Sequence, residues 1–192
     1  MAPAAFALKL ASIAQEQHNM FHMMDETEPP LCAQIKKYWQ GIAPFVSCST
    51  VPWSAVFVSF CVKKAGAAAA EFKFSAQHSV FVHQAIKNAT NNTGVFRGVD
   101  ITKDKPAVGD IIQNNRNGET FNFQFAKNNA DYASHSAIVV ETGVDSEGGF
   151  ALTIGGNEGD SIRRKIVRLD AQGFIKQRTA NPFISLIKNL KT

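Results

Sequence analysis

The stretch Val51-Pro52-Trp53-Ser54-Ala55-Val56-Phe57-Val58-Ser59-Phe60-Cys61 decides how the fold of this chain is interpreted. Its apolar residues continue to Val62, and Lys63-Lys64-Ala65-Gly66 then supplies a basic last turn and a glycine stop, as at the end of a helix. Pro52 suits the first helical position, because its missing N–H needs no partner there. The stretch therefore predicts a buried helix with Ser54 in its first turn.

A serine in the first turn of a helix has two interpretations. The N–H groups of that turn have no acceptor within the helix, and the helix dipole favours negative charge there. A nucleophile that passes through an anionic state is stabilised at such a position. The alternative is that Ser54 only satisfies the end of its own helix, as first-turn serines often do. The stretch by itself leaves both interpretations open.

Composition limits the class of protein. A length of 192 residues, with 45% hydrophobic and 19% charged residues, is typical of one globular domain, here expected over residues 1–192, and excludes a disordered chain. The net charge is +4, and the basic residues are scattered, so we expect no nucleic-acid partner. A mild positive charge still favours an acidic polymer such as a bacterial cell wall.

We expect neither a targeting signal nor a membrane span. Met1–Leu10 has no basic segment followed by a sustained apolar core, so we expect no Sec leader. No apolar run is long enough to span a membrane. We expect a protein that is stored in the cytoplasm and either secreted by a non-Sec route or delivered to the periplasm of a target cell.

The distribution of apolar residues predicts an α+β fold, with N-terminal helices packed on a C-terminal antiparallel sheet. An Asn-, Thr- and Gly-rich loop over 88–98 separates the two halves. Before it we expect helices over Phe6 to about Met24, Leu31–Gln40, the stretch with Ser54, and Ser75 to about Asn88, the last capped by Ser75. After it we expect strands over Val108–Gln113, Ser136–Glu141, Phe150–Ile154, Ser161–Leu169 and Phe183–Ile187.

Three polar residues stand out against these elements. Ser54 begins the buried helix, His135 begins the apolar strand Ser136–Glu141, and Asn157 follows the next strand. Neighbouring strands can bring His135 and Asn157 together. A nucleophile on a helix, a base on one strand and an orienting amide on the next is the Cys-His-Asn arrangement with serine in place of cysteine.

Four motifs occur in order along the chain: Pro52-Trp-Ser-Ala-Val-Phe-Val-Ser-Phe60, Pro106-Ala-Val-Gly-Asp-Ile-Ile112, Ser134-His-Ser-Ala-Ile-Val-Val140 and Gly155-Gly-Asn-Glu-Gly-Asp-Ser-Ile162. Together they resemble the bacterial domain-of-unknown-function family 2272 over roughly residues 13–169. That family is similar to the CHAP and NlpC type of papain-like amidases and endopeptidases. The resemblance implies a papain-like fold and cleavage of amide bonds in peptidoglycan.

The resemblance also implies roles for individual residues. Ser54 falls on the nucleophile, where the amidase pattern has cysteine, His135 on the general base and Asn157 on the residue that orients the base. A serine hydroxyl is harder to deprotonate than a thiol, so the histidine must remove the proton during the attack. No metal or cofactor is needed. Trp53, Ser75, His78 and Arg116 are the candidate substrate-binding residues. Arg116 is suited to a substrate carboxylate, and the alternative is that it is simply solvated.

Other residues offer competing interpretations. Cys48 is a candidate displaced thiol nucleophile, and Glu141 is an alternative orienting residue. The His18 and His22 pair, near Glu16, is a candidate metal site, although two such histidines are more often surface residues. Structural roles are expected at Cys61 in the core, at a partly buried His78 or His83, and at the turn residues Asp110 and Asp160.

Two functions follow as hypotheses. The first is a peptidoglycan amidase or endopeptidase that acts as a secreted antibacterial effector, with a cognate immunity protein as partner. The second is a catalytically inactive papain-like module that binds cell-wall peptide or a protein. The serine at position 54 favours the second hypothesis, whereas the retained His135 and Asn157 favour the first.

Overall fold

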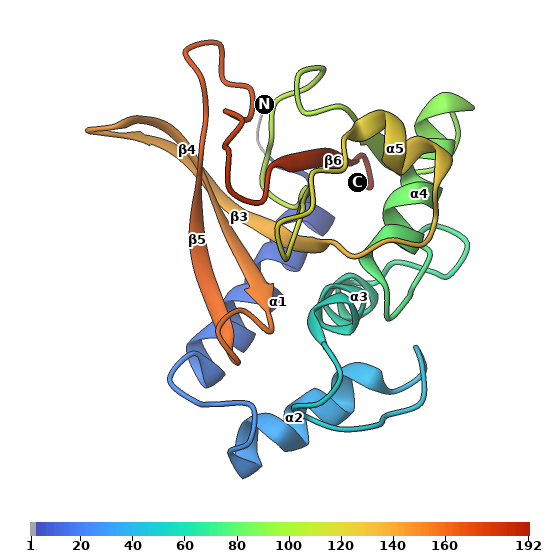
Figure 1. The fold of residues 1–192 in the computed structure, drawn as a ribbon, viewed down its shortest axis with the longest axis vertical. Coiled ribbons are helices and arrows are strands. Elements are labelled where there is room, and N and C mark those ends of the chain that lie inside the picture. The colour runs from blue at the N-terminus through green and yellow to red at the C-terminus, as the bar shows by residue number, and fades with distance from the viewer. Residues whose placement is uncertain (1–2) are drawn as a thin grey trace.

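The computed structural model describes residues 3–192. The first two residues of the segment in which we expect no Sec leader lie outside that range. The described chain has an α+β fold (Figure 1). Its elements are α1 (Ala5–Phe21), α2 (Pro29–Trp39), α3 (Ser54–Ala65), α4 (His78–Thr90), β1 (Phe96–Val99), β2 (Ile111–Asn114), α5 (Phe123–Asn128), β3 (His135–Asp145), β4 (Gly148–Gly156), β5 (Ile162–Arg168) and β6 (Phe183–Asn189). The helix-first, sheet-later layout expected from the sequence is confirmed.

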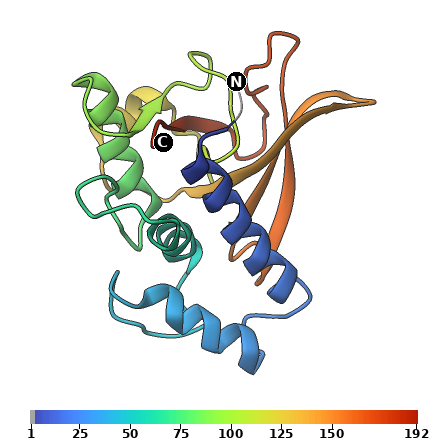
Figure 2. The same cartoon turned by 180° about the vertical axis from the view of Figure 1, so that it is seen from behind.

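Over residues 3–192 the strands form one six-stranded sheet in the order β1-β6-β2-β3-β4-β5. Each pairing in it is antiparallel. The last strand in the sequence, β6, lies between β1 and β2 rather than at an edge. Seen from behind, α1 crosses one face of the sheet (Figure 2), where it contacts β3, β4 and β5.

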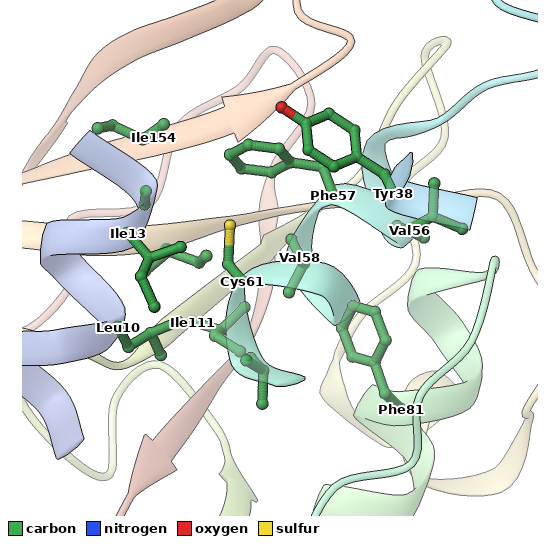
Figure 3. Close-up of a cluster of buried hydrophobic side chains, with 14 of the residues drawn as sticks. Leu10, Ile13, Tyr38, Val56, Phe57, Val58, Cys61, Phe81, Ile111 and Ile154 are labelled. Carbon is green, nitrogen blue, oxygen red and sulfur yellow. The ribbon is translucent and has the colours of Figure 1, made fainter. Parts of the chain in front are cut away.

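Helix α3 lies near the middle of the molecule and is buried along most of its length (Figure 1). It packs against α1, α2, β3 and β4. Its apolar side chains meet those of its neighbours in one cluster, part of which Figure 3 shows: Leu10, Ile13, Tyr38, Val56, Phe57, Val58, Cys61, Phe81, Ile111 and Ile154. Cys61 is a free, buried thiol, as expected from the sequence.

The start of α3 differs from the expectation by two residues. Ser54 itself is the first helical residue, Trp53 is the N-cap and Pro52 precedes the helix. Trp53 has a non-helical backbone, with φ −106° and ψ 6°, as an N-cap residue does, and its fully buried ring donates a hydrogen bond from Nε1 to Glu26. At the other end, Gly66 adopts the left-handed φ of 112° expected of a helix stop.

The structure contains two elements that the sequence pattern did not predict. Strand β1 occupies the end of the stretch expected to be a loop, and α5 follows Asn122, whose side chain accepts a hydrogen bond from the N–H of Phe125. Ser75 was expected to cap the fourth helix, but that helix begins at His78 after Gln77. The Ser75 hydroxyl instead accepts from the N–H of Gln77, which shapes the turn before the helix.

Two further findings concern the cysteines and the membrane. Cys32 of α2 and Cys48, in the segment before α3, form a disulfide across 16 residues. Cys48 therefore has no free thiol, and the interpretation of it as a displaced nucleophile is wrong. Within residues 3–192, no helix combines the length and apolar character that crossing a bilayer requires.

Candidate active site at the start of helix α3

The Ser54 side chain lies against a histidine from the next helix. Ser54 is the first residue of α3 and His78 is the first of α4, and the distance from Ser54 Oγ to His78 Nε2 is 2.7 Å. Both residues are buried, with 3% and 5% of their surface exposed. The sequence named His78 as a candidate residue of the cleft, and its direct contact with the hydroxyl is a finding of the structure.

The surroundings of His78 keep its imidazole neutral. Burial lowers the pKa of His78 well below its usual value, and the positive charges of His135 and Arg116 lower it further. His78 Nδ1 has no hydrogen-bond partner within residues 3–192. A buried N–H without an acceptor costs more than a lone pair without a donor, so we place the proton on Nε2. In that tautomer His78 donates a hydrogen bond to Ser54 Oγ. The hydroxyl proton of Ser54 is then available for a hydrogen bond to another group.

A second histidine lies beside the first and is paired with a carboxylate. The His135 and His78 ring centroids are 5.3 Å apart. His135 Nε2 lies 2.7 Å from Glu158 Oε1, and the other oxygen of Glu158 lies 2.8 Å from Lys165 Nζ. Burial would raise the pKa of Glu158, but the bonds from His135 and Lys165 outweigh it and lower that pKa. The structure thus gives His135 an ionised carboxylate partner.

Two glycines at the end of β4 make room for this arrangement. A Cβ on Gly155 would lie 2.3 Å from Glu158 Oε1 and 2.9 Å from His135 Nε2. A Cβ on Gly156 would lie 2.6 Å from the Trp53 ring and 2.7 Å from Phe57. Gly155 therefore allows the histidine and carboxylate to pair above the strand. Gly156 lets the first turn of α3 pack directly on it.

Asn157, expected to orient His135, contacts a different carboxylate. Its Nδ2 donates to Glu26 Oε2 at 2.7 Å, the oxygen that also accepts from Trp53 Nε1 at 2.8 Å. Asn157 has a left-handed φ of 55°, so the alternation of side chains between the two faces of β4 stops there. Its neighbour Glu158, rather than Asn157, pairs with His135. Through Glu26, Asn157 links the turn after β4 to Trp53, the N-cap of α3.

A cleft runs past Ser54 on two sides. One cavity, of about 470 Å³, is lined by residues that include Ser54, Arg116, His135 and Glu158. A second, of about 340 Å³, shares Ser54 and Arg116 with the first and adds His78. Ser54 therefore lies where the two cavities meet, and Arg116 borders both of them.

The other candidates from the sequence lie elsewhere or have structural contacts. Trp53 is fully buried beneath the site, and Ser75 is bonded to Ser59 through its backbone, so neither faces the cavities. His83 Nδ1 contacts the carbonyl of Ala126, and Glu141 is exposed on β3. Within residues 3–192, neither Glu141 nor Asn157 forms a hydrogen bond with His135, which pairs with Glu158 instead.

The remaining alternatives also have clear positions. The His18 and His22 rings stack with centroids 4.5 Å apart, and His22 Nδ1 bonds to the carbonyl of His18. Asp110 is buried, accepts from the N–H groups of Ala107 and Asn189, and pairs with Lys188. It stabilises a turn, as expected. Asp160 has a left-handed φ of 56° in the turn before β5.

The buried, neutral His78 makes stability depend on pH. Its pKa in the folded chain is lowered, so below about pH 6.5 the unfolded chain binds a proton that the folded chain does not. We expect the free energy of unfolding to be highest above that pH and to fall below it by up to about 1.4 kcal/mol per pH unit. Denaturant unfolding between pH 5 and 8 measures this slope.

His78→Gln should flatten the slope, because glutamine does not titrate. His83→Gln is the matched control, since it removes a histidine of the same helix and keeps the buried contact of His78 with Ser54. Equal slopes for the wild-type chain and His78→Gln would contradict the assignment of a depressed pKa to His78.

The comparisons with known proteins identify a family and nothing finer. No curated protein matches the chain, and neither does any solved structure. One family, described as an uncharacterized protein conserved in bacteria (DUF2272), matches residues 14–185. That range holds Ser54, His78, His135 and Glu158 together with each element from α2 to β5. The chain therefore belongs to the DUF2272 family of bacterial proteins.

Proposed function

We propose that this chain is a hydrolase that cleaves an amide bond in the peptides of peptidoglycan, with Ser54 as its nucleophile. One observation carries the proposal. The Ser54 hydroxyl, at the first position of a buried helix, contacts one imidazole and faces a cavity shared with a second imidazole that a carboxylate holds. A nucleophile, a base and a group that orients the base are the parts that acyl transfer requires.

His135 is the general base in this proposal. A base must accept a proton and carry the resulting charge, and the Glu158 carboxylate 2.7 Å from His135 Nε2 compensates that charge. His78 is less suited to the role, because burial and the nearby Arg116 guanidinium lower its pKa. His78 instead donates from Nε2 to Ser54 Oγ and stabilises the negative charge that develops there.

The reaction follows from these roles. Ser54 Oγ attacks the amide carbonyl carbon while His135 Nδ1 takes the hydroxyl proton. The tetrahedral intermediate collapses, the C–N bond breaks, and His135 returns the proton to the leaving amine. Water then attacks the ester, with His135 again as base, and releases the carboxylic acid and Ser54. The N–H of Ser54 has no acceptor within α3, and in this proposal it binds the carbonyl oxygen during the attack.

Peptidoglycan is proposed as the substrate on two grounds. The motifs around Ser54, His135 and Gly155 resemble the DUF2272 family, which is similar to CHAP and NlpC amidases, and a helix that bears the nucleophile against an antiparallel sheet supports the proposal of a papain-like fold. The net charge of +4 favours an acidic polymer. Delivery to a target periplasm by a non-Sec route, as an antibacterial effector with an immunity protein, is part of the same proposal.

Digestion of purified sacculi tests the proposal. The wild-type chain should release new muropeptides, which mass spectrometry resolves, and Ser54→Ala should release none. Ser49→Ala, an exposed serine of the preceding loop, is the matched control and should remain active. Circular dichroism of Ser54→Ala checks that its loss of activity is not loss of fold.

Two results would contradict the proposed chemistry. Activity that survives in Ser54→Ala would remove Ser54 as the nucleophile. Sacculi that stay intact but sediment with the wild-type chain would instead support a catalytically inactive module that binds cell-wall peptide.

A further inference from the structure

The larger cavity beside Ser54 carries an excess of positive charge. Within residues 3–192, the charged side chains that line it, apart from His135, are Arg116, Lys165, Arg178 and Glu158. Lys165 pairs with Glu158, whose other oxygen bonds to His135. The two guanidinium groups have no carboxylate partner in the described part of the chain.

The backbone at Arg116 is fixed through its neighbour Asn115. Arg116 follows Asn115, which is fully buried and whose side chain bonds to the backbone of Phe121 on both its N–H and its carbonyl and to the carbonyl of Pro182. These bonds fix the backbone after β2. Arg116 is half-buried, and it borders the cavities on both sides of Ser54.

Arg178, which also lines this cavity, is positioned by different contacts. Its guanidinium lies 4.4 Å from the centre of the Phe183 ring, and its Nε donates to the carbonyl of Asn181 at 3.1 Å. The two Nη atoms make no hydrogen bond to residues 3–192. Stacking and one hydrogen bond therefore orient the group, while its terminal N–H donors stay available to a ligand.

We propose that this cavity binds a carboxylate of the peptide substrate, held by Arg116 and Arg178, beside the amide bond presented to Ser54. The inference rests on the proposed function, because it names the class of peptide that the site accepts. Guanidinium groups match the geometry of a carboxylate with paired N–H donors. The preferred substrate is thus a peptide with a free acid group next to the bond that is cleaved.

Binding to the full-length Ser54→Ala chain tests this without turnover. The probes are two tripeptides of alanine, γ-linked glutamate and lysine, which differ only in that the α-carboxyl of the glutamate is free or amidated. By calorimetry we expect the acid to bind roughly tenfold more tightly than the amide, as for a charge-assisted hydrogen bond in a partly exposed site. Adding Arg116→Gln or Arg178→Gln should remove most of this preference.

Arg164→Gln is the matched control, because it removes the same charge from an exposed residue outside the cavity and should keep the preference. Equal affinity for the two peptides, or no binding of either, would overturn the proposal. So would a preference unchanged in both arginine variants, or inorganic phosphate that binds more tightly than the acid peptide. Each outcome is independent of catalysis, which digestion of sacculi by the wild-type chain decides.

Discussion

His135→Ala is expected to lower kcat for release of muropeptides by about 10⁶-fold, as loss of the histidine does in other acyl-transfer sites. The reason is that His135 alone has a carboxylate, Glu158, to compensate the proton it takes from Ser54. His78→Gln should cost only roughly tenfold, since it removes one hydrogen bond to the nucleophile. Steady-state kinetics of the two variants against one muropeptide measures the difference.

Glu158→Gln is a second test of whether His135 or His78 is the general base. Glutamine can still accept a hydrogen bond from His135 Nε2, but it no longer compensates the charge of the imidazolium. We expect kcat to fall by about 10²-fold or more while KM changes little, because the charge exists only during the reaction. If His78→Gln were as damaging as His135→Ala, and Glu158→Gln were fully active, His78 would be the base and the proposed roles would be wrong.

Gly156→Ala is expected to destabilise the chain by about 3 kcal/mol, at the upper end of the range for overpacking a core. The new Cβ would lie 2.6 Å from the Trp53 ring and 2.7 Å from Cβ of Phe57, and both side chains are fully buried. Neither can move unless the first turn of α3 moves with it. The displaced Ser54 should also lose activity in the molecules that remain folded.

Denaturant unfolding measures the free energy, and the activity per folded molecule follows from the same samples. Gly149→Ala is the matched control in the same strand. Its Cβ would meet only the Leu169 side chain, at 3.2 Å, so it should cost less than 1 kcal/mol or so. Equal losses for the two variants would show that the close approach at Gly156 does not hold α3 in position.

The sequence predicted most of the helices and strands because the patterns that specify them are local. The apolar run after Ser54 and the left-handed Gly66 mark one helix, and the apolar run after His135 marks one strand. Strand β1 was missed because its four residues follow a stretch rich in Asn and Gly, although Phe96 and Gly98 alternate inward. The Asn122 cap was the available signal for α5.

The site was predicted less completely because its pairings depend on distant backbone geometry. Asn157 and Glu158 are neighbours, and only the left-handed φ at Asn157 decides which of them reaches His135. The contact between Ser54 and His78 depends on how α3 and α4 pack, which no local pattern specifies. The role of Glu26 could not be predicted for the same reason, because its partners Trp53 and Asn157 lie 27 and 131 residues away in sequence.

The position of β6 inside the sheet has a consequence for folding speed. Strands β1 and β2 meet only through β6, which is about 70 to 90 residues later in the chain than its partners. Pairings between residues so far apart in sequence raise the contact order. The chain must lose the entropy of closing a long loop before these strands gain their hydrogen bonds and contacts. We expect α1 to α4 to form early and the sheet to close slowly, with β1 and β2 exposed as unpaired edges until β6 arrives.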